Sequence, residues 1–106
     1  MFEKLHPVTI SERAALEIQQ IRETKNIPVE YGLRIGIKGA GCGGVSPLIG
    51  FDKRRDSDLA YIIHGINVFV DKRHTLYIIG KEVDFFEGDN ARGFLLRDPN
   101  EVQDTI

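Results

Sequence analysis

The chain has 106 residues, of which 42% are hydrophobic and 28% are charged, and its formal net charge is −2 at pH 7. This length predicts one domain over residues 1–106, and the balanced composition excludes a chain that is disordered throughout. The slightly negative charge argues against a dedicated nucleic-acid-binding protein. There is no signal-peptide core and no run of about 18 apolar residues, so we expect a cytoplasmic protein with no membrane partner.

A short strand and a helix are predicted near the start of the chain. Residues 8–10 alternate between apolar and polar side chains, and Ser11 after them is a preferred helix N-cap. Glu12 suits the positive end of the helix dipole, and Pro28 is expected to end the helix near Lys25. The apolar face of this helix is expected to consist of Ala14, Ala15, Leu16, Ile18 and Ile21. It is the one long helix that the sequence predicts.

The remainder of the chain predicts β-structure, in strands over residues 31–38, 45–51, 59–63, 66–70, 82–86 and 93–96. In the first of these strands Leu33 and Ile35 face one side, while Arg34 faces the other. Pro47 favours an edge position for the second strand, and residues 75–79 fit a strand or a helical turn equally well. The expected fold is therefore mainly β and mostly antiparallel, with one long N-terminal helix (α+β). Its ordered core spans about residues 8–100, and residues 101–106 form a short polar tail.

Three local features concern loops. His64 and Gly65 separate two predicted strands and could connect them as a hairpin, although this pair is not a preferred turn type. The basic residues 53–55 are followed at once by Asp56 and Asp58, which favours a solvated loop. Asp71 ends a predicted strand, where its side chain is expected to cap a following helical turn.

Residues 39–44 read GAGCGG and contain the only cysteine of the chain, Cys42. Gly39, Gly41 and Gly44 match the spacing of the dinucleotide-binding fingerprint and follow a predicted strand. That fingerprint requires a helix directly after it, whereas residues 45–47 favour extended chain. No Gly-Lys-Ser/Thr closes a Walker A loop either. Nucleotide binding is therefore disfavoured.

Three other interpretations of Cys42 remain. It could be a nucleophile with His64 or His74 as its base and Asp71 orienting that base, but this small chain shows no substrate cleft. It could be a buried structural cysteine in a tight connection between strands. However, four glycines cost more conformational entropy than an ordinary β-turn requires, and they leave the sulfur open to a large ligand or a second chain. This favours a thiolate metal ligand.

Residues 31–44, YGLRIGIKGAGCGG, resemble the strand and the glycine–cysteine loop of the A-type iron–sulfur carriers, the HesB/IscA-like family. Residues 10–15, 68–71, 83–85 and 93–100 are similar to the family's helix entry, to two of its strands and to its closing segment. The resemblance spans nearly the whole chain, from about Val8 to Asn100, and the loop is its most specific piece.

The resemblance implies a β-sandwich-like fold with one long helix, assembled into dimers or tetramers. It also implies that the protein binds iron or a transient iron–sulfur cluster and passes it to target proteins. Cys42 matches the loop cysteine of the family and is the implied metal ligand, with Gly41 and Gly43 beside the bound group. The family's two other cysteines, in a C-terminal C-G-C motif, have no counterpart in residues 101–106, EVQDTI.

One chain provides too few ligands to hold an iron–sulfur cluster by itself. Iron–sulfur clusters take about four ligands, and one chain supplies one thiolate. We therefore expect Cys42 of two chains to share iron or a labile cluster, completed by exogenous thiols or oxygen ligands, in a protein that is not an enzyme. The expected partners are a second copy, iron–sulfur assembly proteins or apo-target proteins. The histidines His6, His64 and His74 do not have the spacing typical of a metal site.

Two alternatives stay open. The same fold could act as a metal-free protein-interaction module, because a shared fold does not guarantee a shared site. Alternatively, Cys42 could serve a thiol enzyme or redox sensor, with Lys38 as the nearest positive charge in the sequence to favour its thiolate.

Overall fold

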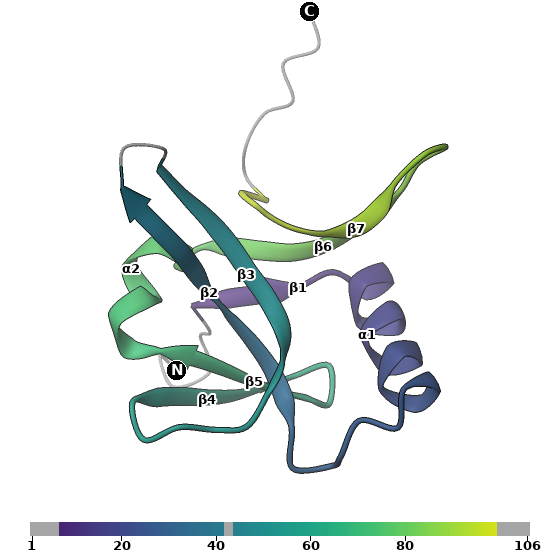
Figure 1. Cartoon of the computed structure of the whole chain (residues 1–106), viewed down its shortest axis with the longest axis horizontal. Coiled ribbons are helices and arrows are strands. Elements are labelled where there is room, and N and C mark those ends of the chain that lie inside the picture. The colour runs from purple at the N-terminus through teal and green to yellow at the C-terminus, as the bar shows by residue number, and fades with distance from the viewer. Residues whose placement is uncertain (1–6, 42–43, 100–106) are drawn as a thin grey trace, which may run out of the picture.

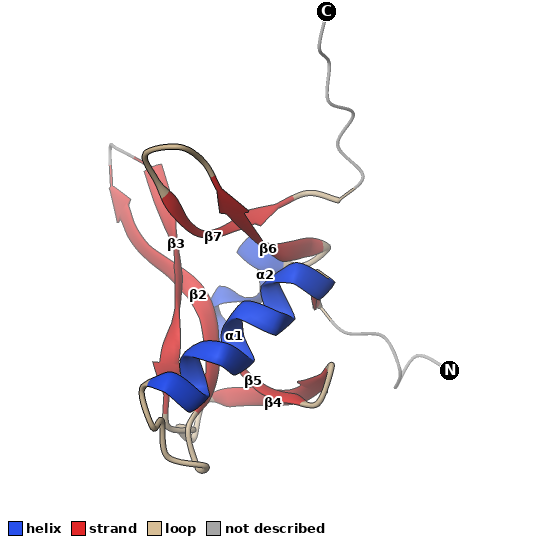
Figure 2. Ribbon diagram, turned by 90° about the vertical axis from the view of Figure 1, so that its right-hand side faces the viewer, coloured by secondary structure: helices blue, strands red, loops and turns tan. Residues whose placement is uncertain are grey.

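The structure is a computed structural model that describes residues 7–41 and 44–99. Its strands form two sheets, and a helix lies beside them (Figures 1 and 2). The elements follow in the order β1 (Val8–Ile10), α1 (Glu12–Thr24), β2 (Gly32–Gly41), β3 (Gly44–Asp52), β4 (Asp58–Ile63), β5 (Ile66–Asp71), η2 (Lys72–His74), α2 (Thr75–Ile78), β6 (Lys81–Glu87) and β7 (Arg92–Arg97). The predicted mainly β fold is confirmed.

Helix α1 begins and ends where the sequence predicts. Ser11 is its N-cap, and the Ser11 hydroxyl accepts a hydrogen bond of 3.2 Å from the backbone N–H of Ala14. Lys25 is the C-cap, and Asn26 follows with a left-handed φ of 53° that ends the helix. The prediction of a long helix is wrong, because α1 has 13 residues, about the average helix length in globular proteins.

The predicted apolar face of α1 is correct except at one position. Ala14, Ala15 and Ile18 are buried, whereas Leu16 is 69% exposed. Residues two positions apart lie on opposite sides of a helix, so Leu16 points away from the core when Ala14 and Ile18 point into it. The expectation that Leu16 belongs to the buried face is therefore wrong.

The four-stranded sheet has the strand order β3-β2-β5-β4, and the three-stranded sheet has the order β1-β6-β7. The three hairpins, β2–β3, β4–β5 and β6–β7, are antiparallel, but β1–β6 and β2–β5 are parallel. Strand β3 is an edge strand, which confirms the position that Pro47 favours.

Two ambiguous segments are settled by the structure. Residues 75–78 form α2, a single helical turn. The β4–β5 hairpin is confirmed, but the statement that its turn is not a preferred type is wrong. His64 and Gly65 have φ values of 52° and 74°, and positive φ at both central residues is the mark of the favoured type I′ hairpin turn.

Both sheets and α1 contribute side chains to one hydrophobic core. Its fully buried members include Ile18 of α1, Leu33 of β2, Val68 of β5 and Val83 of β6. Residues 32–36 of β2 are buried, whereas Lys38 and Gly39 are exposed, so the β2–β3 hairpin extends beyond the core. No helix within residues 7–41 and 44–99 is long and apolar enough to cross a membrane.

Candidate functional site

The β2–β3 hairpin carries the glycine–cysteine segment. Its regular register runs from the pair Gly32 and Asp52 to the pair Lys38 and Ser46, and it is then shifted before Gly41 pairs with Gly44. Gly39 lies within this irregularity with a φ of 75°, a value that glycine adopts without steric cost. The glycines therefore serve a real backbone requirement near the end of the hairpin.

The predicted site residues are placed only in part. Gly41 is the last residue of β2 and pairs with Gly44, the first residue of β3. Cys42 and Gly43 lie outside the described residues, so their assignment as metal-binding and cofactor-binding residues stays a prediction. The pairing on either side fixes where the chain enters and leaves this two-residue segment.

The described residues near this end of the hairpin are exposed. Lys38 and Gly39 on β2 are exposed, as are Ser46 and Pro47 on β3. Among these four the only ionisable side chain is that of Lys38. A group bound here would be approached from solvent and would meet a positive charge.

The histidines do not converge on one place. The backbone N–H of Ile37 donates to Nδ1 of His74 at 3.4 Å, while Nε2 of His64 donates to the carbonyl oxygen of Ile10 at 2.8 Å. A Cβ atom added to Gly36 would lie 2.6 Å from Nδ1 of His74, so Gly36 makes room for this ring against β2. Within the described ranges, no group of three His, Cys, Asp or Glu side chains could hold a metal ion.

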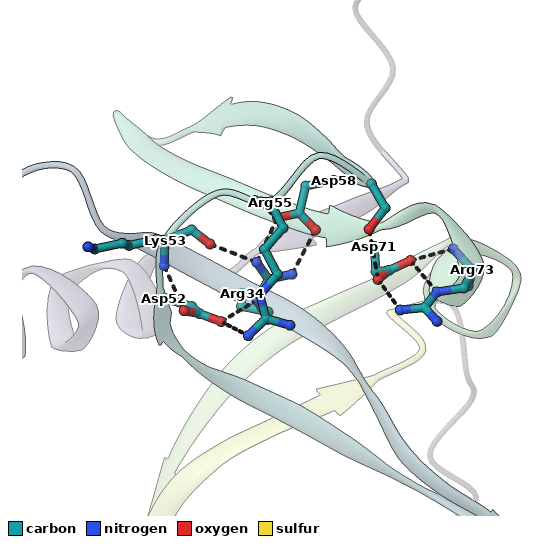
Figure 3. A network of polar contacts seen from close by, with 8 residues as sticks. Arg34, Asp52, Lys53, Arg55, Asp58, Asp71 and Arg73 are labelled. Carbon is teal, nitrogen blue, oxygen red and sulfur yellow. Dashed lines mark hydrogen bonds and ion pairs between the residues drawn. The ribbon is translucent and has the colours of Figure 1, made fainter.

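Arg34 is the centre of a buried polar network on the outer side of β2 (Figure 3). Its guanidinium donates to both carboxylate oxygens of Asp58, at 2.7 and 2.6 Å. It also donates to Asp52 at 2.8 Å and to the carbonyl oxygen of Lys53 at 2.8 Å. These hydrogen bonds raise the pKa of Arg34 and hold the pKa of Asp58 below its usual range. The network closes the 52–58 loop over the sheet.

The prediction of a solvated loop is wrong for Asp58. This side chain has no exposed surface, and its partner is Arg34 rather than the neighbouring basic cluster. Of that cluster, Arg55 forms an exposed ion pair of 2.8 Å with Asp52. One sequence signal could have identified Arg34, namely a charged side chain in the middle of a predicted strand, between the apolar residues Leu33 and Ile35.

Asp71 has the capping role that the sequence predicts. Its Oδ1 accepts from the backbone N–H of Arg73 at 2.9 Å, at the start of η2. The Arg73 guanidinium donates to both oxygens of the same carboxylate, and Ser57 donates to it at 3.2 Å. The hydrogen bonds from Arg73 hold the pKa of Asp71 well below its usual range. Asp71 is therefore a structural anion and not the partner of a histidine base.

Asp84 forms a second network that sequence reasoning did not identify. Its carboxylate accepts from Ser11 at 2.6 Å, from Arg13 at 2.7 and 2.9 Å, and from Arg97 at 3.0 Å. The bonds from Arg13 contribute most to holding the pKa of Asp84 well below its usual range. Because Arg13 lies on α1 and Arg97 on β7, this one carboxylate joins the helix to the three-stranded sheet.

Known proteins match most of this chain in sequence, and a solved structure matches it in fold. No family model matches the chain. The protein named SufA of Bacillus subtilis is 36% identical over 98 residues, which are 92% of this chain and 81% of that protein. The iron–sulfur cluster insertion protein ErpA of Xanthomonas campestris is 35% identical over 96 residues, 89% of this chain and 73% of that protein. The crystal structure of Escherichia coli SufA, which is involved in the biosynthesis of iron–sulfur clusters, superposes with a TM-score of 0.71. It is 27% identical, and the match covers 90% of this chain and 82% of that one.

Proposed function

This chain belongs to the HesB/IscA family of A-type iron–sulfur carriers, and we propose that it binds iron or a labile iron–sulfur cluster and delivers it to other proteins. The cluster is cargo in this role, taken up and released rather than kept. The names of the relatives, which include a cluster insertion protein, support this proposal. The fold shared with Escherichia coli SufA over 90% of the chain supports it too.

One observation carries the assignment of the site. The paired residues Gly41 and Gly44 bring both strands of an exposed hairpin to the only cysteine of the chain. The thiolate of Cys42 is the only thiolate that the sequence offers, and iron–sulfur clusters are held by thiolates. Gly41 and Gly43 add no side chain beside the sulfur, so a bulky group has room to bind. Lys38 on the same hairpin favours a negatively charged cargo.

The ligand count requires more than one chain. A cluster takes about four ligands, and the described residues contain no cluster of three His, Cys, Asp or Glu side chains that could hold a metal ion. Two chains would each contribute Cys42, and exogenous thiols or oxygen ligands would complete the set. Such loosely completed coordination suits a carrier, because ligands that exchange easily allow the cargo to leave.

Several broader assignments accompany this proposal. The protein acts as a carrier rather than as an enzyme, and as a homodimer or homotetramer. Its partners are proteins that assemble clusters or receive them. Residues 1–106 form one domain, and the cytoplasm is the expected compartment.

Anaerobic reconstitution with iron, sulfide and a small thiol tests the proposal. Wild-type protein is expected to gain the visible charge-transfer absorption of a thiolate-bound cluster, and Cys42→Ser is expected to lack it. His74→Gln is a matched control, since this change keeps the loop thiolate and alters a side chain of η2 that contacts the same hairpin through the backbone N–H of Ile37. Absence of colour and of stoichiometric iron in the wild type would instead support a metal-free interaction module. Equal colour in the wild type and in Cys42→Ser would refute the assignment of the site.

A further inference from the structure

Helix α2 and the residue after it expose three large apolar side chains. Leu76 is 86% exposed, Tyr77 is 50% exposed and Ile79 is 58% exposed, while Ile78 between them is fully buried. We call Leu76, Tyr77 and Ile79 the α2 patch. Because Ile78 anchors the turn in the core, the patch is held in place on the surface. Apolar side chains that gather on a surface in this way mark interaction sites.

Within residues 72–81, which contain the α2 patch, there is no side-chain carboxylate and the charged side chains are positive. Residues 72–81 contain Lys72, Arg73 and Lys81 but no Asp or Glu. Arg73 is neutralised by Asp71, at 2.8 Å, so the lysines at the two ends of the segment set the local charge. The patch therefore fits an apolar segment that also carries acidic side chains. A second copy of the patch would bring the same positive charges and would be repelled.

The chain leaves the last strand close to this patch. Arg97, at the end of β7, pairs in register with Glu82, and their side chains form an ion pair of 2.8 Å. Glu82 lies only three residues after Ile79 of the patch. Figures 1 and 2 agree that the end of β7 lies beside the start of β6 and near α2. Seven residues follow Pro99, enough to span up to about 23 Å at 3.3 Å per residue.

The segment that follows has the chemistry that the patch requires. Residues 101–106 carry two acids, Glu101 and Asp104, and two apolar side chains, Val102 and Ile106, with no basic residue. We propose that this segment docks on the α2 patch of its own chain, with its apolar side chains on the patch and its carboxylates toward the flanking lysines.

The other end of the chain is a weaker fit for the same surface. The carbonyl oxygen of Pro7 accepts a hydrogen bond of 2.6 Å from the backbone N–H of Gly80, so residues 1–6 also join the structure beside α2. However, those residues carry Glu3 and Lys4, whose charges cancel. Charge complementarity therefore selects residues 101–106.

Methyl-resolved nuclear Overhauser spectroscopy on the full-length protein tests the proposal without any metal, so its outcome is independent of cluster binding at Cys42. We expect cross-peaks between the methyl groups of Val102 or Ile106 and those of Leu76 or Ile79. The double variant Leu76→Ser/Ile79→Ser should lose them. Because both patch residues are exposed, these changes leave the core intact.

Two further variants test whether the charge of residues 101–106 contributes to docking and whether the α2 patch is the specific surface. Glu101→Lys/Asp104→Lys should weaken the cross-peaks about two-fold or more, since it reverses the charge of the segment. Leu16→Ser, a matched change at an exposed leucine on α1, should leave them unchanged. Absence of the cross-peaks in the wild type would overturn the proposal. Cross-peaks found only between differently labelled chains would assign the segment to a second copy. Cross-peaks from Phe2 or Leu5 would assign the patch to residues 1–6.

Discussion

Replacing Arg34 with Met should strongly destabilise the fold, because it leaves a buried carboxylate without its countercharge. Asp58 has no exposed side-chain surface, and without Arg34 its remaining hydrogen-bond donor among the described residues is the backbone N–H of Arg55, at 2.7 Å. Asp52 also loses a hydrogen bond, but its side chain is 31% exposed and water can replace the donor. Breaking a buried pair from one side costs about 3–5 kcal/mol, and we assign most of this cost to Asp58.

Urea unfolding followed by far-ultraviolet circular dichroism suits this protein, which has no tryptophan. With a slope of about 2 kcal/mol per M, a loss of about 4 kcal/mol lowers the urea midpoint by about 2 M. The double variant Arg34→Met/Asp58→Leu removes both charges and should recover most of the loss. Arg55→Met is the matched arginine control, because its ion pair with Asp52 is exposed and contributes little.

The pH dependence of the free energy of unfolding tests independently whether Arg34 neutralises the buried carboxylate of Asp58. The pKa of Asp58 is lowered in the native protein, so the pair stabilises the fold above the unfolded pKa of about 3.9. This stabilisation is lost as the pH falls through the lower folded pKa. In Arg34→Met, burial without the countercharge raises the pKa of Asp58, so acid neutralises it. The stability gap between the two proteins should therefore shrink from pH 7 toward pH 4. A gap below about 1 kcal/mol at pH 7, or one that does not change with pH, would refute this account.

Three further predictions concern α1 and the β4–β5 turn, and urea unfolding checks each of them. Ile18→Ala should lower the free energy of unfolding by about 2–5 kcal/mol, because Ile18 is fully buried. The control Leu16→Ala should change it by less than about 0.5 kcal/mol. Equal effects of the two variants would contradict the orientation of α1. Gly65→Ala should lower the free energy of unfolding by about 1 kcal/mol, because Gly65 has a positive φ. Gly50→Ala should not destabilise the protein, because a Cβ atom at Gly50 would have no atom within 4 Å. A destabilised Gly50→Ala would contradict the role of φ. Ser11→Ala should cost about 1–2 kcal/mol, because it removes the N-cap and the hydrogen bond to Asp84. An unchanged stability would show that both interactions of this hydroxyl are dispensable.

The elements that depend on local chemistry could be predicted from the sequence. Ser11 marks the start of α1, Asp71 caps η2, and Pro47 lies on an edge strand. Each of these residues acts on backbone groups within a few positions of itself, or on the strand that contains it. Alternating apolar side chains likewise placed the strands, because the two faces of a strand meet different surroundings.

Features that join distant segments could not be predicted in the same way. The parallel pairings of β1 with β6 and of β2 with β5 depend on which strands meet across the core. Arg34 and Asp58 are 24 residues apart, and Ser11 and Asp84 are 73 apart, so neither pair leaves a local signature. At the candidate site, the glycines indicated an unusual backbone, and Gly39 confirms it with a positive φ. The ligands that complete the site stay a prediction, because one chain offers a single thiolate.

Native mass spectrometry of the anaerobically reconstituted protein shows whether two chains share one cluster, because it counts chains and clusters together. We expect a species of two chains with one iron–sulfur cluster and its small thiol ligands, and we expect Cys42→Ser to form no such species. A cluster that is bound by a single chain, or that is retained by Cys42→Ser, would contradict the claim that two Cys42 thiolates share the cargo.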